Sequence, residues 1–241
     1  MHNTIHFILQ GKGGIGKSFV SCLLAQYFKT QNASLKCFDL DQVNSTLSYY
    51  KALNVEHFDV LDDDDTVVPK KFDGLMEELF TQEGTFVIDT GANTFSNLLS
   101  YLIQNDIFSL LREYGKKVYI HTIVGGGDAL LDTANGFNSI ATGADARLVL
   151  WLNQHFGKLE TEEGKEFIDA KVFNAHKAKL SGIVILSSRQ KDKYGDDVVK
   201  MNTKRLTLTE VMESSEFMIA EKQRIKTVIN DVFHQLSKIE W

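Results

Sequence analysis

A glycine-rich run near the start of the chain, GKGGIGKS, has the residue types that bind phosphate groups. Gly11, Gly16, Lys17 and Ser18 form the pattern G-x-x-x-x-G-K-S, in which backbone N–H groups and the positive end of the following helix converge on phosphate oxygens. Lys17 would neutralise the terminal phosphates, and Ser18 would supply a ligand to Mg²⁺. Gly11, Gly13 and Gly16 also fit the dinucleotide pattern G-x-G-x-x-G. The Gly-Lys-Ser end favours a triphosphate, because a dinucleotide site has no use for that lysine and hydroxyl; a plain glycine-rich turn is the third alternative.

Two further apolar runs end in carboxylates. In KCFDLDQ, Asp39 and Asp41 are two residues apart, so an extended backbone would point both the same way; a turn or cap role is the alternative. The run TFVIDTG ends in Asp89, an acid placed to hold magnesium through a water, with helix capping as its alternative role. Gly91 would let a backbone N–H approach the γ-phosphate. With Lys17 on the phosphates, these groups suffice to transfer a phosphoryl group to water.

Short apolar segments separated by amphipathic stretches must position these residues. Several are nearly continuous apolar runs, which is typical of strands buried on both faces of a parallel sheet. We expect strands at Ile5–Leu9, Leu35–Leu40, Thr85–Asp89, Lys117–Val124, Arg147–Leu152 and Gly182–Ser187, with a weaker one at Phe58–Leu61. We expect helices at Lys17–Lys29, Asp73–Phe80, Phe95–Tyr114, Asp128–Ile140 and Glu216–Ile239. Such alternation predicts right-handed βαβ units in one α/β domain spanning residues 1–241, with the ligand at the carboxyl ends of the strands.

Composition narrows the class of protein. The chain has 241 residues, 43% of them hydrophobic and 24% charged, which argues against disorder. A net charge of -6 counts against a whole-surface preference for nucleic acid or anionic membrane. No 18-residue apolar run and no cleavable signal are apparent, and Cys22 and Cys37 are expected to be reduced core thiols of a cytoplasmic protein. None of the seven histidines has metal-ligand or triad spacing, so His6 and His121 are expected to be packing residues.

KGGIGKS resembles the deviant Walker A loop, K-G-G-x-G-K-S/T, of the MinD/ParA class of P-loop ATPases, which includes the nitrogenase iron protein. The resemblance implies a single-domain P-loop NTPase of the SIMIBI class, with a mostly parallel, twisted sheet of about seven strands flanked by helices. It implies ATP or ADP with Mg²⁺ as the ligand. The residues that would contact the nucleotide are Gly11, Lys12, Gly13, Gly14, Ile15, Gly16, Lys17, Ser18, Phe19 and Gly91.

The same resemblance assigns roles to individual side chains. Lys12 matches the signature lysine that reaches across a dimer to the partner's phosphates; a solvated loop lysine is the alternative. Asp41 matches the aspartate that orients or deprotonates the attacking water, and Ser18, Asp41 and Asp89 form the implied magnesium site. Gln42 stands where the class usually has proline, and T-G-A-N-T after Asp89 lacks the usual prolines.

Signals farther along the chain are weaker. Asn153, after the strand LVLWLN, matches an asparagine that bonds adenine in this class, with a polar turn residue as the alternative. Three glycines before Asp128 predict a loop followed by a helix cap. Basic residues near the C-terminus resemble the nonspecific DNA-binding surface of ParA-like proteins, although a solvated loop is favoured: Lys191, Lys193, Lys200, Lys204 and Arg205. An apolar stripe in the last helix is expected to face the core rather than a membrane: Ile225, Ile229, Val232, Leu236 and Ile239.

Within this class, LQGKGGIGKS and FDLDQVNSTLSYYKALNV resemble the TraL conjugal transfer proteins of conjugative plasmids more closely than MinD or ParA. This closer resemblance covers about residues 5 to 55. It implies a cytoplasmic bacterial ATPase that forms a homodimer with ATP and works with a conjugation or plasmid-maintenance partner. A dethiobiotin-synthetase-like ligase and a non-hydrolysing nucleotide-binding scaffold are the alternatives. Lys12 and the D-x-D motif favour the dimerisation switch.

Overall fold

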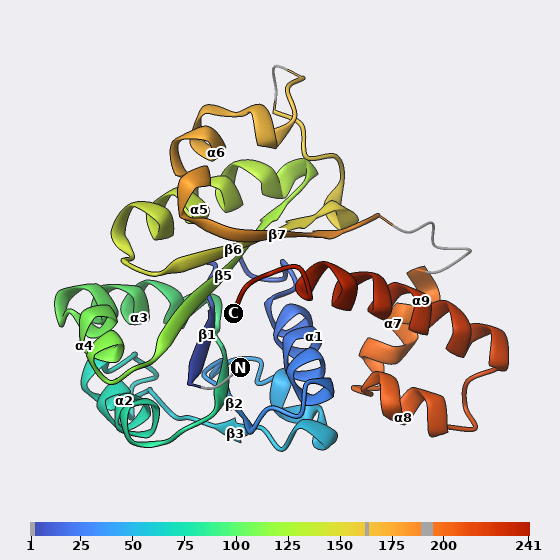
Figure 1. Ribbon diagram of the computed structural model, residues 1–241, viewed down its shortest axis with the longest axis horizontal. Helices are drawn as coiled ribbons and strands as arrows, with labels where there is room; N and C mark the ends of the chain where they lie inside the picture. Colours follow the sequence, from blue (N-terminus) through green and yellow to red (C-terminus); the bar gives the residue numbers. More distant parts are fainter. Residues whose placement is uncertain (1–2, 162–163, 189–194) are drawn as a thin grey trace.

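The computed structural model describes residues 3–161, 164–188 and 195–241, and a seven-stranded parallel sheet runs through its centre (Figure 1). The strand order is β3-β2-β4-β1-β5-β6-β7, and every paired neighbour is parallel. The strands are β1 (Thr4–Ile8), β2 (Leu35–Asp39), β3 (Glu56–His57), β4 (Thr85–Asp89), β5 (Lys117–Gly125), β6 (Arg147–Asn153) and β7 (Leu180–Leu186). This parallel α/β architecture confirms the expected fold class.

Helices cover both faces of the sheet, so each face has its own apolar core. The α-helices are α1 (Lys17–Thr30), α2 (Phe72–Thr81), α3 (Ala92–Gln104), α4 (Ile107–Glu113), α5 (Leu130–Gly143), α6 (Lys171–His176), α7 (Asp196–Thr203), α8 (Leu208–Glu213) and α9 (Ile219–Leu236). Short 3-10 turns add η1 (Leu47–Tyr49), η2 (Lys51–Leu53), η3 (Pro69–Lys71), η4 (Gly127–Ala129), η5 (Gln154–Phe156), η6 (Phe167–Asp169) and η7 (Lys177–Lys179). Helices α2 to α6 pack on one face, and α1 with α7, α8 and α9 on the other (Figure 1).

The central strand β1 explains why its sequence is almost entirely apolar. It lies between β4 and β5, and all five of its residues are buried. Ile5 and Phe7 belong to the core under α2 to α6, whereas Ile8 belongs to the core under α1 and α9. The chain passes from β1 to β2 on one side of β1, and from β4 it crosses to β5 on the other side. The carboxyl end of β1 is therefore a topological switch point, where open parallel sheets bind ligands.

Two expected elements were wrong. The weak strand expected at Phe58–Leu61 is instead the two-residue strand β3, paired with Phe38 and Asp39. After β3 the chain leaves the sheet, and Leu61 pairs with Val67 in an isolated antiparallel bridge. The single helix expected at Phe95–Tyr114 is two helices, α3 and α4, because Asp106 adopts a left-handed conformation with φ 50° between them.

The last helix starts later than expected and ends earlier. Its first residue is Ile219 rather than Glu216, because the Met218 N–H is capped by the Glu221 carboxylate at 2.6 Å.

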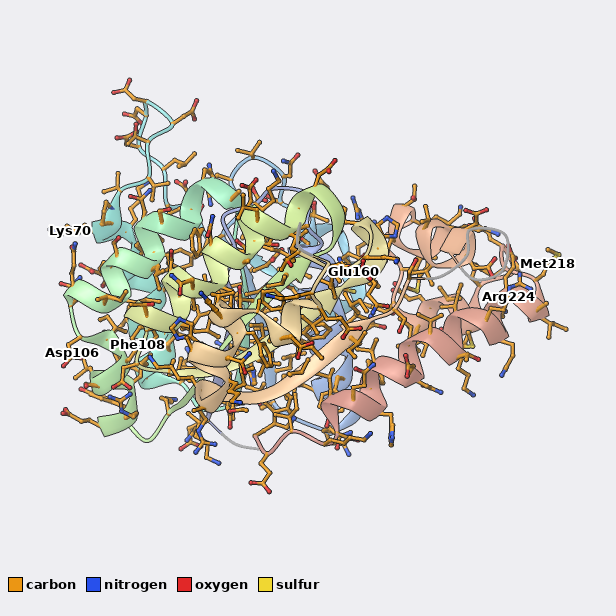
Figure 2. All side chains as sticks on the ribbon, turned by 90° about the horizontal axis from the view of Figure 1, so that it is seen from above. Lys70, Asp106, Phe108, Glu160, Met218 and Arg224 are labelled. Carbon is orange, nitrogen blue, oxygen red and sulfur yellow. The ribbon has the colours of Figure 1, made fainter. Side chains whose placement is uncertain are left out.

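Helices α6, α7 and α8 were not expected at all. Asp128 lies in η4 and makes no side-chain cap, so the helix cap expected there was wrong. Figure 2 shows that Met218 and Arg224 lie at the end of the molecule opposite Asp106 and Phe108.

The cysteines and the strand histidines are core residues, as expected. Cys22 and Cys37 are free and buried, and burial raises the pKa of each thiol to about 12. The Trp151 indole N–H donates to Nδ1 of His121 at 3.0 Å. That bond leaves the proton on Nε2 of His121, which lies 3.0 Å from Nδ1 of His6 and donates to it. Burial lowers the pKa of both rings, that of His121 to about 3, so the pair is neutral at physiological pH.

Candidate functional site

The glycine-rich loop follows β1 at the switch point and is anchored from below by Gln10. This side chain is 1% exposed and donates to the carbonyls of Ile123 and Thr133, at 2.8 and 3.1 Å. Its own Oε1 accepts the N–H of Gly11 at 2.9 Å. Gln10 therefore ties the start of the loop to β5 and α5. Gly136 leaves room for it, since a Cβ at that position would lie 2.1 Å from the Gln10 oxygen.

The loop itself has a conformation that requires glycine. Gly14 and Gly16 have φ values of 70° and 99°, in the left-handed region that glycine adopts without a Cβ penalty. Among the described residues, no acceptor bonds the backbone N–H groups of Gly13, Gly14 and Gly16. Ile15 is buried and packs against Gly125, which holds the loop down on β5. The loop thus offers several free N–H donors beside the first turn of α1, the arrangement that binds phosphate.

Lys17 lies inside the loop rather than on the surface. Its side chain is buried, and its ammonium donates to the carbonyl of Lys12 at 3.0 Å. Burial lowers the pKa of Lys17, while Asp89 and Asp41 raise it. A buried ammonium with a single neutral acceptor gains strongly from an anionic ligand.

Asp89 ends β4 beneath the loop and is fully buried. Its Oδ1 accepts the Ser21 hydroxyl at 2.9 Å, whereas Oδ2 has no partner at hydrogen-bond geometry. Burial raises the pKa of Asp89 to about 7, and nearby Asp39 adds to this; the Ser18 and Ser21 hydroxyls and the Lys17 ammonium oppose it. An unsatisfied buried carboxylate oxygen is costly for the empty protein, and a cation or a metal-bound water would satisfy it.

The two aspartates after β2 are in different environments. Asp39 is buried, and its carboxylate accepts the N–H of Asp41 and both the N–H and the hydroxyl of Ser48, all at 3.0 to 3.1 Å. Burial nevertheless raises the pKa of Asp39. Asp41 is half-buried and accepts the N–H groups of Val43 and Asn44 at 3.0 Å. Asp39 therefore shapes the loop, and Asp41 is the carboxylate that remains near the surface.

Asp41 lies against the backbone that follows β4. A Cβ on Gly91 would lie 2.9 Å from Oδ1 of Asp41, so the absence of a side chain at Gly91 permits this approach. Thr94, in the first turn of α3, donates to the Leu40 carbonyl at 3.1 Å and holds the two loops together. Gln42, which replaces the usual proline, donates to the Phe58 carbonyl at 2.8 Å. These bonds give the loop a tether that the missing ring would otherwise provide.

Lys12 projects from the rim of the loop. Its ammonium pairs with Asp132 of α5 at 2.8 Å, and the two side chains are 43% and 58% exposed. Exposed pairs of this kind contribute at most about 1 kcal/mol. Lys12 is therefore held within its own chain by a contact weak enough to be exchanged.

Asn153 lies at the end of β6, where its amide contacts the loop. Nδ2 donates to the Ile15 carbonyl and Oδ1 accepts the His155 N–H, both at 3.1 Å. A cavity of about 390 Å³ opens beside it, with Phe19 of α1 and apolar residues of α7 and α9 in its walls. Its size and largely apolar lining with a few polar groups are typical of small-molecule sites. The structure thus brings Asn153 and Phe19 together at one cavity that continues from the loop.

The chain has close relatives among proteins of known name. It is 39% identical over 234 residues to a Protein TraL of Escherichia coli, covering 96% of both chains, and 40% identical to a second Escherichia coli Protein TraL over the same length. The chain belongs to the TraL family. No protein-family model matches it.

Solved structures give this TraL-family chain its fold class. MinD of Aquifex aeolicus, in its complex with MinC, is 13% identical over 99% of this chain and 97% of that chain, with a TM-score of 0.54. MinD of Pyrococcus horikoshii, complexed with Mg-ADP, is 16% identical over 99% and 100%, also with a TM-score of 0.54. At such identities the likeness shows the fold alone, and it is the MinD/ParA-like P-loop fold that the sequence predicts.

Phosphate oxygens would have to complete any magnesium site in this TraL-family chain. Within the described ranges, no group of three or more His, Cys, Asp or Glu side chains could hold a metal by itself. The residues present still fit Mg²⁺, which keeps several waters and binds through one or two carboxylates plus substrate phosphates. Ser18 and the unpartnered oxygen of Asp89 are the groups that would face it.

The C-terminal basic residues that the structure describes do not line this site. Lys200 and Lys204 pair with Glu221 and Glu216, while Lys191 and Lys193 lie outside the described residues. The apolar stripe of the last helix is buried in the core with α1, which confirms the core-facing expectation. In the part of the chain that the structure describes, no helix is both long and apolar enough to cross a membrane.

Three side chains that support the site belong to no sequence motif. Gln10, Ser21 and Asp132 are absent from any motif, yet they hold the loop, Asp89 and Lys12. One signal was available: Ser21 is a polar residue four positions after Lys17 and therefore lies on the same face of α1. Gln10 likewise interrupts an apolar run immediately before the loop.

Proposed function

We propose that this TraL-family chain is a nucleotide-switch ATPase of the bacterial cytoplasm. It binds ATP with Mg²⁺, pairs with a second copy of itself around the nucleotide, and hydrolyses ATP slowly. A conjugation or plasmid-maintenance partner reads the paired state in plasmid transfer or positioning. The name of the Escherichia coli relatives and the Mg-ADP complex of Pyrococcus horikoshii MinD agree with this proposal.

Hydrolysis follows from positioning and charge rather than from a covalent nucleophile. The free N–H groups of the loop and the Lys17 ammonium bind the phosphate oxygens and stabilise the charge that spreads over them. Mg²⁺, when bound, supplies further positive charge at those oxygens. Asp41 lies beside Gly91, where its carboxylate orients water or accepts its proton as the water attacks the γ-phosphorus. Asn153 and Phe19 orient the base in the adjoining cavity, for which we propose adenine.

Pairing of two chains is supported by the rim of the site. Lys12 is 43% exposed and held only by its contact with Asp132, so it is free to exchange that carboxylate for a partner's phosphates. Two apolar side chains are exposed nearby: Val43, which is 70% exposed and follows Asp41, and Leu131, which is 68% exposed and precedes Asp132. A second copy would bury them.

One observation carries the proposal: the buried ammonium of Lys17 and the unsatisfied carboxylate oxygen of Asp89 lie near each other, without pairing, beneath a loop of free N–H donors. Each group is costly without a ligand, and together they match a phosphate with its cation. The pyrophosphate of a nicotinamide dinucleotide could accept from the buried ammonium, but the dinucleotide brings no cation for the unsatisfied carboxylate.

The test is the oligomeric state measured by sedimentation with ADP, with ATP and with magnesium chelated. Asp41→Ala keeps bound ATP from being consumed, so this variant should sediment as a dimer with ATP and Mg²⁺ and as a monomer with ADP. Lys12→Ala in the same background should remain a monomer. An Asp41→Ala chain that binds ATP yet never changes its sedimentation would contradict the switch.

A turnover assay separates the remaining alternatives. Wild type should release phosphate in a single turnover without any added acceptor. Release only with an acceptor would indicate a ligase, and nucleotide binding with no release would indicate a scaffold.

A further inference from the structure

A second polar hollow lies at the amino ends of β5, β6 and β7, the opposite edge of the sheet from the glycine-rich loop. Its volume is about 480 Å³. Five cationic side chains line it, from the end of α4, the starts of β5 and β6, and η7. We name this hollow the basic groove: Arg112, Lys116, Lys117, Arg147 and Lys179.

The cations of the basic groove outnumber the acidic side chains in its lining. Among the described residues, only Arg112 forms an ion pair there, with Asp145 at 2.7 Å. Lys117 and Lys179 instead donate to the backbone carbonyls of Trp241 and Ala141, at 3.0 and 2.6 Å. The Ala141 carbonyl is a neutral acceptor and leaves the positive charge of Lys179 uncompensated.

The other two cations are held by rings and carbonyls. Arg147 lies over the Tyr119 ring, 5.9 Å from its centre. Lys116 is turned inward, donating to the Gln82 carbonyl, and Glu83 is the carboxylate near it. The groove therefore presents the charges of Lys117, Arg147 and Lys179 to solvent, since all three side chains are exposed.

This arrangement is unusual for a chain with a net charge of -6. Elsewhere Lys200 of α7 pairs with Glu221, and Lys204, just after that helix, pairs with Glu216. In the groove, like charges are gathered around a floor of small side chains, Ala144, Ala146 and Ala178. Small residues leave room for a ligand, and a concave site whose charge is mainly positive, five cations against the Asp145 carboxylate, focuses the field on an anion.

We propose that the basic groove is a second anion site, separate from the glycine-rich loop, which binds a molecule carrying several phosphate groups. Phosphate oxygens recognise ammonium and guanidinium groups equally well from two sources, a nucleic-acid backbone and a free polyphosphate. The proposal does not depend on the nucleotide switch, because none of the groove residues lines the loop or its cavity.

The test compares two variants of equal charge. The groove variant combines Lys117→Gln, Arg147→Gln and Lys179→Gln. The control variant combines Lys51→Gln, Lys70→Gln and Lys226→Gln, three exposed lysines outside the groove. Each is titrated against a labelled 20-base-pair duplex by fluorescence anisotropy over a salt series, and against sodium tripolyphosphate by calorimetry. The glycine-rich loop is intact in both, so their difference reports on the groove.

For a nucleic-acid ligand, the groove variant should bind the duplex at least about 10-fold more weakly than wild type. Its plot of log affinity against log salt should be shallower by about 2.7, or 0.9 for each lost phosphate contact. The control should match wild type within about 2-fold. If the ligand is a free polyphosphate, the duplex should not bind to wild type or to either variant. The heat of tripolyphosphate binding should then be lost in the groove variant only.

Two outcomes would overturn the proposal: no binding of either probe by wild type at low salt, or equal weakening in both variants. Thermal unfolding of each variant checks its fold. If the groove variant does not fold, Arg147→Gln alone replaces it, because no backbone carbonyl depends on that side chain. It should reduce the salt slope by about 0.9.

Discussion

Lys17 and Lys29 are two lysines of one helix that both donate to a backbone carbonyl, yet they differ in burial. Lys17 is buried beneath the loop, whereas Lys29 is exposed and bonds Ala52 at 2.8 Å. We expect Lys17→Met to weaken ATP binding by about 100-fold or more, because two charge-assisted bonds to phosphate are lost. Its thermal midpoint should not fall, since a buried ammonium is removed. Calorimetric titration and thermal unfolding measure both.

Lys29→Met is the matched control on the same helix. It should bind ATP as wild type does. Equal losses of affinity in the two variants would mean that the loop does not use Lys17 as an anion ligand.

The pH dependence of metal-free stability should report on Asp89. Its folded pKa, about 7, lies above the unfolded value of 3.8, so the folded state binds more protons between these values and stability falls as pH rises through that window. Asp89→Asn removes this loss, which is at most about 4 kcal/mol at pH 8. Urea unfolding in EDTA at pH 5 and pH 8 should show the free energy of unfolding of the variant, relative to wild type, rising by about 2.6 kcal/mol between the two pH values. A constant difference would mean that Asp89 is ionised throughout.

At the scale of single residues, the sequence predicts the groups that contact the ligand better than the side chains that hold those groups in place. Lys17 and Asp89 belong to spaced motifs whose chemistry is general, and the structure brings them together. Gln10 and Asp132 act through contacts with residues more than a hundred positions away. Such pairings depend on the sheet order, which no local pattern contains.

At the scale of elements, the glycine-rich loop is positioned by a close contact between Gln10, which follows β1, and Gly136 of α5. Gly136→Ala would place a Cβ 2.1 Å from Oε1 of Gln10 and displace the side chain that anchors the loop. The usual helix gain of glycine to alanine, about 0.5–1 kcal/mol, should be outweighed by overpacking and lost hydrogen bonds. We expect a net loss of about 2 kcal/mol in the free energy of unfolding, measured with urea.

A double-variant cycle provides the control for this contact. Gln10→Ala should lower stability alone, yet Gly136→Ala should add little further loss in the Gln10→Ala background. Ser139→Ala, at an exposed position of the same helix, should be nearly neutral. Additive losses would place the strain of Gly136→Ala somewhere other than Gln10.

Element boundaries show where periodicity stops being informative. The β4 bounds match the expectation because a buried strand is a short apolar run with clear ends. The α3–α4 break was missed because apolar residues continue at helical spacing on both sides of it, with Leu102 before Asp106 and Ile107 after. Both helices bury that stripe in the same core, so the pattern is unbroken although the backbone turns at Asp106.

The whole molecule has two chemically different edges of one sheet. The free N–H donors of the glycine-rich loop and the loops that follow β2 and β4 lie at the carboxyl ends of the strands. The basic groove lies at the amino ends of β5, β6 and β7. Net charge conceals the second edge, because -6 averages over a surface on which cations are locally concentrated. The groove cations come from three separate stretches of the sequence, residues 112–117, 147 and 179, and these stretches meet because β5, β6 and β7 are neighbours.

The buried histidines should control the acid stability of the whole fold. The pKa of His6 and that of His121 lie below the ordinary 6.5, so the unfolded chain binds protons that the folded chain does not, and stability falls as pH drops below about 6.5. His6→Phe keeps an aromatic ring among Phe28, Tyr119 and Trp241 and removes one such group. Between pH 6 and pH 4.5, the slope of unfolding free energy against pH should therefore decrease by about 1.4 kcal/mol per pH unit.

Urea unfolding measures this slope. His234→Phe, at an exposed position of α9, is the control that should keep the wild-type slope. An unchanged slope in His6→Phe would show that His6 takes up its proton in the folded state.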